Sequence, residues 1–264
     1  MRRRTAVIHD GRKYGSLFSY FPKKEVFILH ALVLVSGGLD STTCLAIAVN
    51  KHRADNVAAL SISYGQRHAR ELDAANDVAH FYNVPLHTFD LADIFRLSNS
   101  TLLDSSKLPL DHASYADLLN QSPRIPTYVP FRNGLFLSVA AAFADSLFQD
   151  DVELFIGVHS DDAGNAYPDC SAPFVAAMSA AIRIATYEKI HIVAPFLCQT
   201  KADVVKAGLQ LDAPYHLTWS CYERGDIPCG QCATCRDRAT AFAKNGVKDP
   251  AIDFLKRKKF SSLL

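Results

Sequence analysis

The 264-residue chain is 49% hydrophobic, which is enough for a full core, and its length fits one large α/β domain with a small appendage. Its formal net charge of +1 excludes a broad polyanion-binding surface, so stable nucleic-acid binding is not expected. The apolar runs are too short to cross a bilayer, no secretory signal is found, and the odd number of cysteines is unlike a secreted disulfide framework. We therefore expect a cytoplasmic protein that does not bind membranes.

Residues 1–30 form a basic segment, with seven Lys and Arg residues against two acidic ones. Two short apolar patches, at 6–8 and 26–29, could form a hairpin against the edge of a sheet. The alternatives are a loosely ordered extension and a basic arm for nucleic acid, although no pattern of aromatic residues accompanies the charge. The sequence thus predicts an N-terminal extension over residues 1–30 that need not be ordered.

A buried strand over Ala31–Val35 is followed by the sequence Ser-Gly-Gly-Leu-Asp-Ser at residues 36–41, and a helix is expected from there. Glycines let backbone N–H groups approach an anion, and the start of a helix adds positive potential. Ser36 and Ser41 offer hydroxyl donors, and Asp40 can hold Mg²⁺ against phosphates. An ordinary strand-to-helix turn is the alternative. The whole string favours a nucleotide site, which is neither a Walker loop nor a dinucleotide fingerprint.

Strands alternate with helices along the rest of the first 210 residues. This order predicts a doubly wound parallel sheet with right-handed crossovers, in a domain over residues 31–210. Residues 97–130 lack periodicity and predict a long functional or mobile loop. Further strands are expected over Val57–Tyr64, Leu86–Phe89, Val152–Val158 and Ile190–Ala194, with helices over Arg70–Phe81, after Asn133, from Ser171, and from Lys201 until Gly208 closes the helix.

Polar residues follow several of these strands, at the edge where ligands bind in such sheets. Arg67 and His68 follow the second strand, and Arg132 stands at the start of an apolar helix, where a guanidinium can bind phosphate or carboxylate. Residues 159–170 follow the fourth strand, where a substrate should lie, and Lys201 follows the fifth in a capping-box pattern over Thr200–Asp203. The alternatives are solvated residues at helix starts.

Residues 211–264 carry a cluster of cysteines. Two consecutive Cys-x-x-Cys steps and a nearby fourth cysteine let four thiolates converge on one ion. Because a Cys₄ set leaves no position for water, zinc here would be structural, and an iron–sulfur cluster is the alternative. Two of the remaining cysteines, Cys44 and Cys198, are expected to be small buried side chains. The four proposed ligands are Cys221, Cys229, Cys232 and Cys235.

Five motifs together resemble the 7-cyano-7-deazaguanine synthase family, within the adenine nucleotide α-hydrolase-like ATP pyrophosphatases. The resemblance runs from about Leu32 to the end of the chain, so the N-terminal extension lies outside it. Two departures are Phe131, where glycine is expected, and a loop from Gly157 to Tyr167 that is one residue longer. The motifs are residues 36–41, 64–68, 128–133, 167–170 and 219–222, the last followed by the cysteine cluster.

The resemblance implies a set of site residues. Catalytic roles are implied for Ser36, Asp40, Ser41, Arg132 and Lys201. Substrate contacts are implied for Arg132, Asn133, Asp161, Asp162, Tyr167 and Asp169. Nucleotide contacts are implied for Val35, Ser36, Gly37, Gly38, Leu39, Asp40, Ser41, Thr42, Thr43, Cys44, Leu45, Tyr64, Gln66, Arg67 and His68.

The resemblance also implies the reaction, with ATP, Mg²⁺ and Zn²⁺ as cofactors and a homodimer as the assembly. 7-Carboxy-7-deazaguanine would be adenylated, converted by ammonia to an amide, adenylated again and dehydrated to the nitrile. No glutaminase domain is seen, so free ammonia is the expected nitrogen source. The alternatives are a tRNA-thiolating enzyme with the same loop, a relative that transfers an activated deazapurine to a protein or other acceptor, and a zinc-knuckle nucleic-acid binder.

Overall fold

The computed structural model describes residues 29–67, 70–109, 120, 122, 124–163, 167–223, 225–252 and 254. The predicted N-terminal hairpin falls outside these residues except for its end, and so do His68 and the side chain of Asp162. Within the described part of the chain, no helix is both long and apolar enough to cross a membrane.

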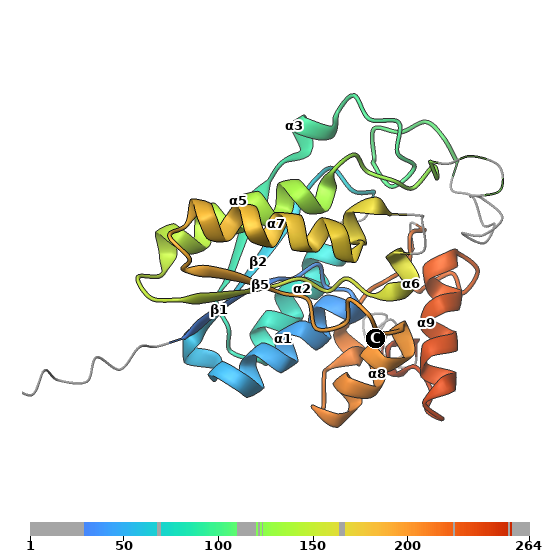
Figure 1. Cartoon of the computed structure of the whole chain (residues 1–264). Helices are drawn as coiled ribbons and strands as arrows, with labels where there is room; N and C mark the ends of the chain where they lie inside the picture. The colour runs from blue at the N-terminus through green and yellow to red at the C-terminus, as the bar shows by residue number, and fades with distance from the viewer. Residues whose placement is uncertain are drawn as a thin grey trace, which may run out of the picture.

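One parallel sheet forms the centre of the structure, and it confirms the predicted fold class (Figure 1). The strand order is β3-β2-β1-β4-β5, and each neighbouring pair is parallel. After β1 the chain moves outward to β2 and β3, and it then crosses to β4 on the other side of β1. The switch point therefore lies between β1 and β4, where such sheets bind ligands. The strands are β1 His30–Leu34, β2 Val57–Ser63, β3 Leu86–Asp90, β4 Val152–Phe155 and β5 Ile190–Val193.

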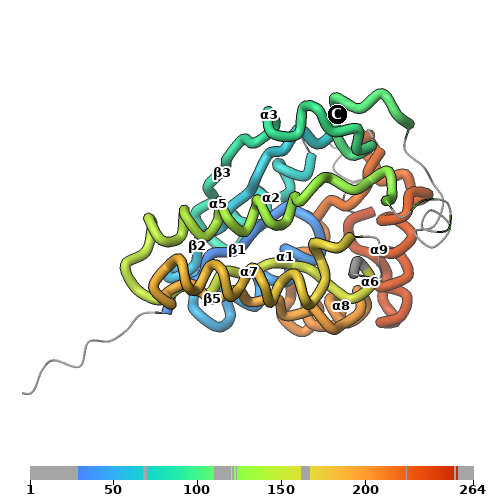
Figure 2. The backbone as a smooth tube through the Cα atoms, turned by 45° about the horizontal axis from the view of Figure 1, so that its top comes forward, coloured from blue at the N-terminus to red at the C-terminus, as the bar shows by residue number. Residues whose placement is uncertain are grey.

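Helices cover both faces of the sheet. In Figure 1, α5 and α7 lie above the sheet and α1 and α8 lie below it, and Figure 2 shows α5 and α7 again side by side. The α-helices are α1 Leu39–His52, α2 Arg70–Phe81, α3 Ala92–Phe95, α5 Arg132–Leu147, α6 Ser160–Ala163, α7 Ala172–Ala185, α8 Lys201–Gln210 and α9 Ala233–Lys244. Short 3₁₀ helices are η1 Ala54–Asn56, η2 Pro168–Cys170 and η3 Tyr215–Leu217.

Alternate strand residues face the two helical layers. In β1, Ala31 and Val33 belong to the core shared with α1, α2 and α8, whereas Leu32 belongs to the core shared with α5 and α7. All three side chains are fully buried. A strand that is buried on both faces has a continuous run of apolar residues, and this run allowed the strand to be predicted from the sequence.

Most element boundaries lie within two residues of the predictions, and α2 has the predicted bounds. The fourth strand ends at Phe155 rather than Val158. Ile156 N–H still donates to Val193 O at 3.0 Å, but Pro195, which follows β5, has no N–H to extend the ladder. Cys198, in the turn after β5, is exposed rather than buried, because this connection runs over the surface.

Gly208 does not close α8, which continues to Gln210. The prediction was wrong because this glycine serves a packing contact rather than a helix end. A Cβ on Gly208 would overlap the hydroxyl of Tyr215 and lie 2.5 Å from its Cζ atom. Tyr215 is fully buried, and its hydroxyl pairs with Thr43 Oγ1 at 2.7 Å and donates to Val204 O at 3.1 Å. Gly208 therefore makes room for a tyrosine that joins α1 to α8.

We predict that Gly208→Ala destabilises the protein by about 1 to 3 kcal/mol, because overpacking at Tyr215 outweighs the gain in helix propensity. Urea unfolding monitored by circular dichroism would measure this. Lys206→Ala, at an exposed position of the same helix, is the control and should change stability by less than about 0.5 kcal/mol. A Gly208→Ala variant as stable as the parent would contradict the packing role.

Candidate functional site

The loop between β1 and α1 has a shape that depends on Gly37. Its φ is +78°, a left-handed conformation that favours glycine. A Cβ at this position would overlap Glu71 O and lie 2.6 Å from Ala75 N, so the α2 backbone packs directly against the loop. On the other side, Trp219 N–H donates to Gly37 O at 2.9 Å. The loop is thus held between α2 and the C-terminal region.

Serine hydroxyls close the loop internally. Ser41 Oγ accepts from Ser36 N–H at 3.2 Å and donates to Gly38 O at 3.2 Å. Ser36 Oγ lies 3.1 Å from Ser41 Oγ and accepts from Gly38 N–H at 3.3 Å. The first backbone N–H groups of α1 have no partners within the helix, so they can donate to an anion, while the two hydroxyls hold the loop in shape.

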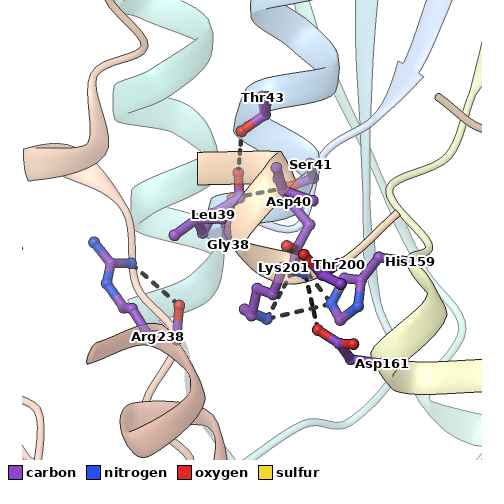
Figure 3. Close-up of polar contacts among 12 residues, drawn as sticks. Gly38, Leu39, Asp40, Ser41, Thr43, His159, Asp161, Thr200, Lys201 and Arg238 are labelled. Atoms are coloured by element: carbon purple, nitrogen blue, oxygen red, sulfur yellow. Dashed lines mark hydrogen bonds and ion pairs between the residues drawn. The ribbon is translucent and has the colours of Figure 1, made fainter. Parts of the chain in front are cut away.

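Asp40, in the first turn of α1, faces two basic side chains (Figure 3). Its Oδ2 accepts from Lys201 Nζ at 3.1 Å, and its Oδ1 lies 3.7 Å from His159 Nε2. Lys201 Nζ and His159 Nε2 are 3.5 Å apart. The three side chains come from the residues that follow β1, β4 and β5, so the parallel sheet brings them together.

The Lys201 backbone is fixed as well. The predicted capping box is present, because Thr200 accepts from Asp203 N–H and the Asp203 carboxylate accepts from Thr200 N–H at 2.9 Å. Asp161 Oδ2 accepts from Lys201 N–H at 2.8 Å (Figure 3). Asp161, a predicted substrate contact, thus caps α8 from the neighbouring segment and orients Lys201.

The charge on Asp40 is stabilised in place. Burial raises the pKa of this carboxyl, but the positive charges of Lys201 and His159 and the Lys201 hydrogen bond outweigh burial, so the pKa falls below its ordinary value of 3.8. Asp40 is therefore ionised at neutral pH. Its Oδ1 is buried and has no hydrogen-bond partner among the described residues. A buried carboxylate oxygen of this kind suits a hard cation such as Mg²⁺.

A cavity of about 230 Å³ opens at this edge of the sheet, at the switch point between β1 and β4. Its walls include residues after β1, β2, β4 and β5 together with the first turns of α1, α2, α5 and α8. The structure thus gathers segments far apart in the sequence. The predicted site residues that line this cavity are Val35, Ser36, Gly38, Leu39, Asp40, Ser41, Tyr64, Gln66, Arg132, Asn133 and Lys201.

The later residues of the predicted nucleotide set do not line the cavity. Thr42, Thr43, Cys44 and Leu45 are buried within the domain, and the Thr43 hydroxyl donates to Leu39 O at 2.9 Å. Burial raises the pKa of the Cys44 thiol, so it stays protonated. These side chains support the loop from behind.

The Arg67 side chain binds backbone carbonyl groups and does not line this cavity. Its guanidinium donates to Leu103 O at 3.1 Å, Ser106 O at 2.9 Å and Leu108 O at 2.6 Å. It therefore holds the beginning of the long loop in place. Gln66, by contrast, lies at the cavity wall, where its Oε1 accepts from Tyr64 N–H at 2.8 Å.

Three predicted substrate residues form a framework around the start of α5. Asp169 Oδ2 accepts from Asn133 N–H at 3.0 Å, and Asn133 Nδ2 donates to Asp169 O at 3.1 Å. Tyr167 OH lies 2.8 Å from Thr127 Oγ1. These contacts place Arg132 at the cavity, with its Cζ 5.5 Å from the ring centre of Tyr64.

Phe131 precedes this helix with a φ of +51°, which explains the expectation of glycine here. A side chain in the left-handed region costs roughly 1–2 kcal/mol. The ring lies against Gly134 and edge-on to Phe174, with ring centres 6.0 Å apart, and is 55% exposed. It does not line the described cavity. This departure from the family pattern therefore lies beside the cavity wall.

The C-terminal region completes the cavity. The sequence assigned no role to Trp219, Ser220, Tyr222, Thr234 and Asp237, yet all five line it. Only the motif at 219–222 gave a signal, through the family resemblance. Glu71, also missed, lines the cavity from the first turn of α2, and its position at the start of the helix that follows β2 was the available signal.

Arg238 fastens this region from α9. It is 5% exposed and binds Asp249 through Nε–Oδ2 at 2.6 Å and Nη2–Oδ1 at 2.9 Å. It also donates to Thr218 Oγ1 at 2.7 Å and to Tyr215 O at 3.1 Å. A bidentate, buried guanidinium thus fixes the segment that leads into Trp219.

The four cysteines of the predicted metal set converge. Their Sγ atoms all lie within 4.8 Å of one another, and sulfurs on a tetrahedron around zinc lie about 3.8 Å apart. Cys229 N–H donates to Cys221 Sγ at 3.3 Å, and Cys232 N–H donates to Cys229 Sγ at 3.3 Å. Such donors stabilise thiolates. The cluster therefore fits a zinc site.

Comparisons with known proteins agree with this geometry. Residues 30–246 match the sequence model of a family described as "Queuosine biosynthesis protein QueC". A 7-cyano-7-deazaguanine synthase from Thermoplasma volcanium is 41% identical over 225 residues, which cover 83% of this chain and 89% of that protein. One from Pseudoalteromonas atlantica is 41% identical over 220 residues, covering 83% and 96%. An NMN synthetase structure from Francisella tularensis has a TM-score of 0.42 and 13% identity, covering 86% and 82%, a likeness too low to support an argument.

We predict that Lys201→Met destabilises the protein by about 1 to 3 kcal/mol, because Asp40 loses its main counter-charge while the cavity admits some water. Adding Asp40→Asn should recover part of this loss, a coupling that urea unfolding of the two single variants and the double variant would measure. Lys51→Met, at a half-exposed ion pair with Glu153, is the control and should cost less than about 1 kcal/mol.

The same pair predicts a pH dependence. In the parent, the stability contributed by the ionised Asp40 is lost only as pH falls through its lowered pKa, below 3.8. Without Lys201, burial should raise that pKa, so the Lys201→Met variant should gain stability as pH is lowered from neutral. Additive effects of the two substitutions, with no difference in pH dependence, would contradict the coupling.

Proposed function

The chain belongs to the family of the queuosine biosynthesis protein QueC, and we propose that it is an ATP-dependent ligase that makes 7-cyano-7-deazaguanine from 7-carboxy-7-deazaguanine and ammonia. The observation that carries the proposal is the single cavity in which the loop of residues 36–41 faces Arg132 and Lys201. A carboxylate substrate and the phosphates of ATP would meet there.

The phosphates of ATP would lie on the loop. The N–H groups at the start of α1 would donate to them, the hydroxyls of Ser36 and Ser41 hold the loop in shape, and Lys201 adds a cation after β5. Asp40 holds Lys201 there and offers Oδ1 to a metal. Bound Mg²⁺ would neutralise charge on the departing pyrophosphate.

The carboxylate of the substrate would lie toward Arg132. This guanidinium stands at the first position of α5, where the Asp169–Asn133 contacts hold the backbone, and it faces the ring of Tyr64. A planar guanidinium suits bidentate binding of a carboxylate or a phosphate. It can therefore align the carboxylate oxygen with the α-phosphate for attack.

Adenylation solves a chemical problem. Ammonia cannot displace oxide from a carboxylate, because oxide is a very poor leaving group, whereas AMP leaves readily. The carboxylate oxygen attacks the α-phosphate and pyrophosphate departs. Ammonia then forms the amide and releases AMP. A second adenylation, on the amide oxygen, lets that oxygen leave with AMP as the nitrile forms.

The rival reactions find less support. A thiolating enzyme needs reactive sulfur at its site, but four cysteines form the cluster, Cys44 and Cys170 are buried, and the exposed Cys198 does not line the cavity. Transfer of an activated deazapurine to another acceptor was suggested by Phe131 and by the longer loop from Gly157 to Tyr167. Phe131 does not line the cavity. Dimer formation, the use of free ammonia, the cytoplasmic location and the boundary at residue 210 stay predictions.

We predict that the purified protein, given 7-carboxy-7-deazaguanine, ATP and ammonium salts, forms the nitrile, which mass spectrometry identifies. Asp40→Asn should reduce turnover at least about 100-fold, because it releases Lys201 and removes the metal-binding charge. Asp55→Asn, at an exposed site beyond the other end of α1, is the matched control. Sulfide incorporation, or an Asp40→Asn variant with normal pyrophosphate release, would refute the assignment.

We predict that zinc removal disturbs the cavity wall as well as the fold. Trp219 is the chain's one tryptophan, and its Nε1–H donates to Cys221 O at 2.9 Å. Cys221→Ser should therefore lower bound zinc, shift the Trp219 emission spectrum, and lower Tm by more than about 2 °C, the shift for roughly 1 kcal/mol in a chain of this size.

Cys198→Ser, at the exposed cysteine, is the control and should leave metal content and emission unchanged. Iron and sulfide in anaerobically purified protein would contradict the zinc assignment. Unchanged emission after complete metal removal would instead show that the cluster does not shape the cavity.

A further inference from the structure

A second, smaller hollow adjoins the main cavity. Its volume is about 20 Å³, which is room for one molecule the size of water or ammonia. All but one of its lining residues also line the main cavity, so a molecule held here stands beside the reaction site. The lining residues are Tyr64, Gln66, Arg67, Glu71, Leu102 and Tyr222.

Glu71 is the one carboxylate in this lining. It lies in the first turn of α2, whose backbone packs directly against Gly37 of the loop between β1 and α1. The side chain is partly buried, and it makes no hydrogen bond to the other described residues. The cavity wall thus holds the Glu71 carboxylate beside the loop between β1 and α1, and its oxygens can accept hydrogen bonds from a ligand.

Other acceptors and rings surround the same space. Gln66 Oε1 accepts one hydrogen bond from Tyr64 N–H and keeps a second lone pair. Tyr64 and Tyr222 add two aromatic rings to the lining, and the ring of Tyr64 also lies 5.5 Å from Arg132 Cζ. A carboxylate, an amide oxygen and aromatic rings around a one-molecule space form a set of groups suited to a small cation with several N–H donors.

The charged groups that face Glu71 do not neutralise it. The Arg67 guanidinium is occupied by the carbonyls of residues 103, 106 and 108. Arg132 acts on Glu71 across the cavity. Burial raises the pKa of Glu71 to about 7 and the charge of Arg132 only partly opposes that rise, while burial raises the pKa of Tyr64 to about 12. Tyr64 is therefore neutral and Glu71 titrates near physiological pH.

We propose that this hollow is an ammonium site, in which Glu71 binds the cation and removes the proton that stops its nitrogen from acting as a nucleophile. The proposal rests on the proposed function, which makes ammonia the co-substrate. At neutral pH most ammonia in water is ammonium, and its nitrogen has no free electron pair. An enzyme that takes its ammonia from solution gains from a site that captures the cation.

The proton balance of the step is simple. An N–H bond of ammonium breaks, its proton passes to a Glu71 carboxylate oxygen, and the electron pair stays on nitrogen. That pair forms the C–N bond to the adenylated carboxyl carbon. The C–O bond to AMP breaks, and AMP leaves with its electron pair. Once the C–N bond has formed, the nitrogen carries a positive charge and loses one proton to water, which leaves the neutral amide. Glu71 then gives the proton that it accepted to water before the next turnover.

The first test is Glu71→Gln, which keeps the shape and removes the base. At pH 7 the value of kcat/KM for ammonia should fall about 100-fold, the usual contribution of a general base. The KM for the carboxylate substrate should be unchanged, as should pyrophosphate release without ammonia. Hydroxylamine, already largely uncharged at pH 7, should react with the variant at close to the parent rate. Glu188→Gln, at an exposed glutamate before β5, is the matched control.

The second test uses the unmodified protein, so it does not depend on the folding of a variant. Because Glu71 must be ionised to accept the proton, kcat/KM for total ammonia should fall as pH drops through about 7 and stay level above it until ammonium itself loses its proton. If the enzyme instead captures only uncharged ammonia, kcat/KM rises steadily in proportion to the uncharged fraction until ammonium itself loses its proton. The Glu71→Gln variant should show that steady rise.

Each other outcome has a definite meaning. A steady rise in the unmodified protein overturns the ammonium site. An equal loss with ammonia and hydroxylamine in Glu71→Gln, with a raised KM for the carboxylate substrate, overturns it in favour of a contact to the heterocycle. If the unmodified protein releases no pyrophosphate with the carboxylate substrate, the proposed function fails first. If the unmodified protein does release pyrophosphate, and Glu71→Gln has the same kcat/KM for ammonia as the parent, only the ammonium site fails.

Discussion

The position of Gly37 between two packed segments is the constraint on which the rest of the site depends. Its left-handed backbone lets the loop turn, and its missing side chain lets the α2 backbone touch it. Its carbonyl accepts the Trp219 N–H from the C-terminal region. The anion-binding donors, the first turn of α2 and the cavity wall are therefore fixed relative to one another by one residue. No side chain larger than hydrogen fits that role.

Charge is distributed around this loop according to the order of the strands. Asp40 follows β1, His159 follows β4 and Lys201 follows β5, and adjacent parallel strands bring their carboxyl ends together. The attraction between Asp40 and Lys201 offsets part of the desolvation free energy that both charges lose inside a partly buried cavity. Glu71 lies across the loop with no such partner among the described residues, so its proton is easily exchanged near neutral pH. One site thus holds a permanent carboxylate and a titrating one.

Local signals in the sequence predicted the fold and the centre of the site. The apolar run before residue 36, the strand–helix alternation and the Cys-x-x-Cys spacing each have a direct physical reading, and the structure places them as expected. What failed depended on tertiary contacts. Gly208 was read as a helix end because the partner that needs its space, Tyr215, is defined only by the fold. Arg67 and Asp169, whose ligand contacts stay predictions, also hold backbone groups of distant segments, and no spacing rule could reveal this second role. Glu71 was missed because its burial, rather than its place in a motif, makes it unusual.

The fate of the carboxylate oxygens tests the central claim, attack on the α-phosphate at this loop, most directly. 7-Carboxy-7-deazaguanine carrying oxygen-18 in both carboxylate positions would be converted with ATP and ammonia, and the nucleotide and phosphate products analysed by mass spectrometry. The account predicts that both labelled oxygens leave in AMP, one in each of two AMP molecules for every nitrile formed. Label recovered in inorganic phosphate, with ADP as the nucleotide product, would contradict it, because the substrate would then have been phosphorylated rather than adenylated.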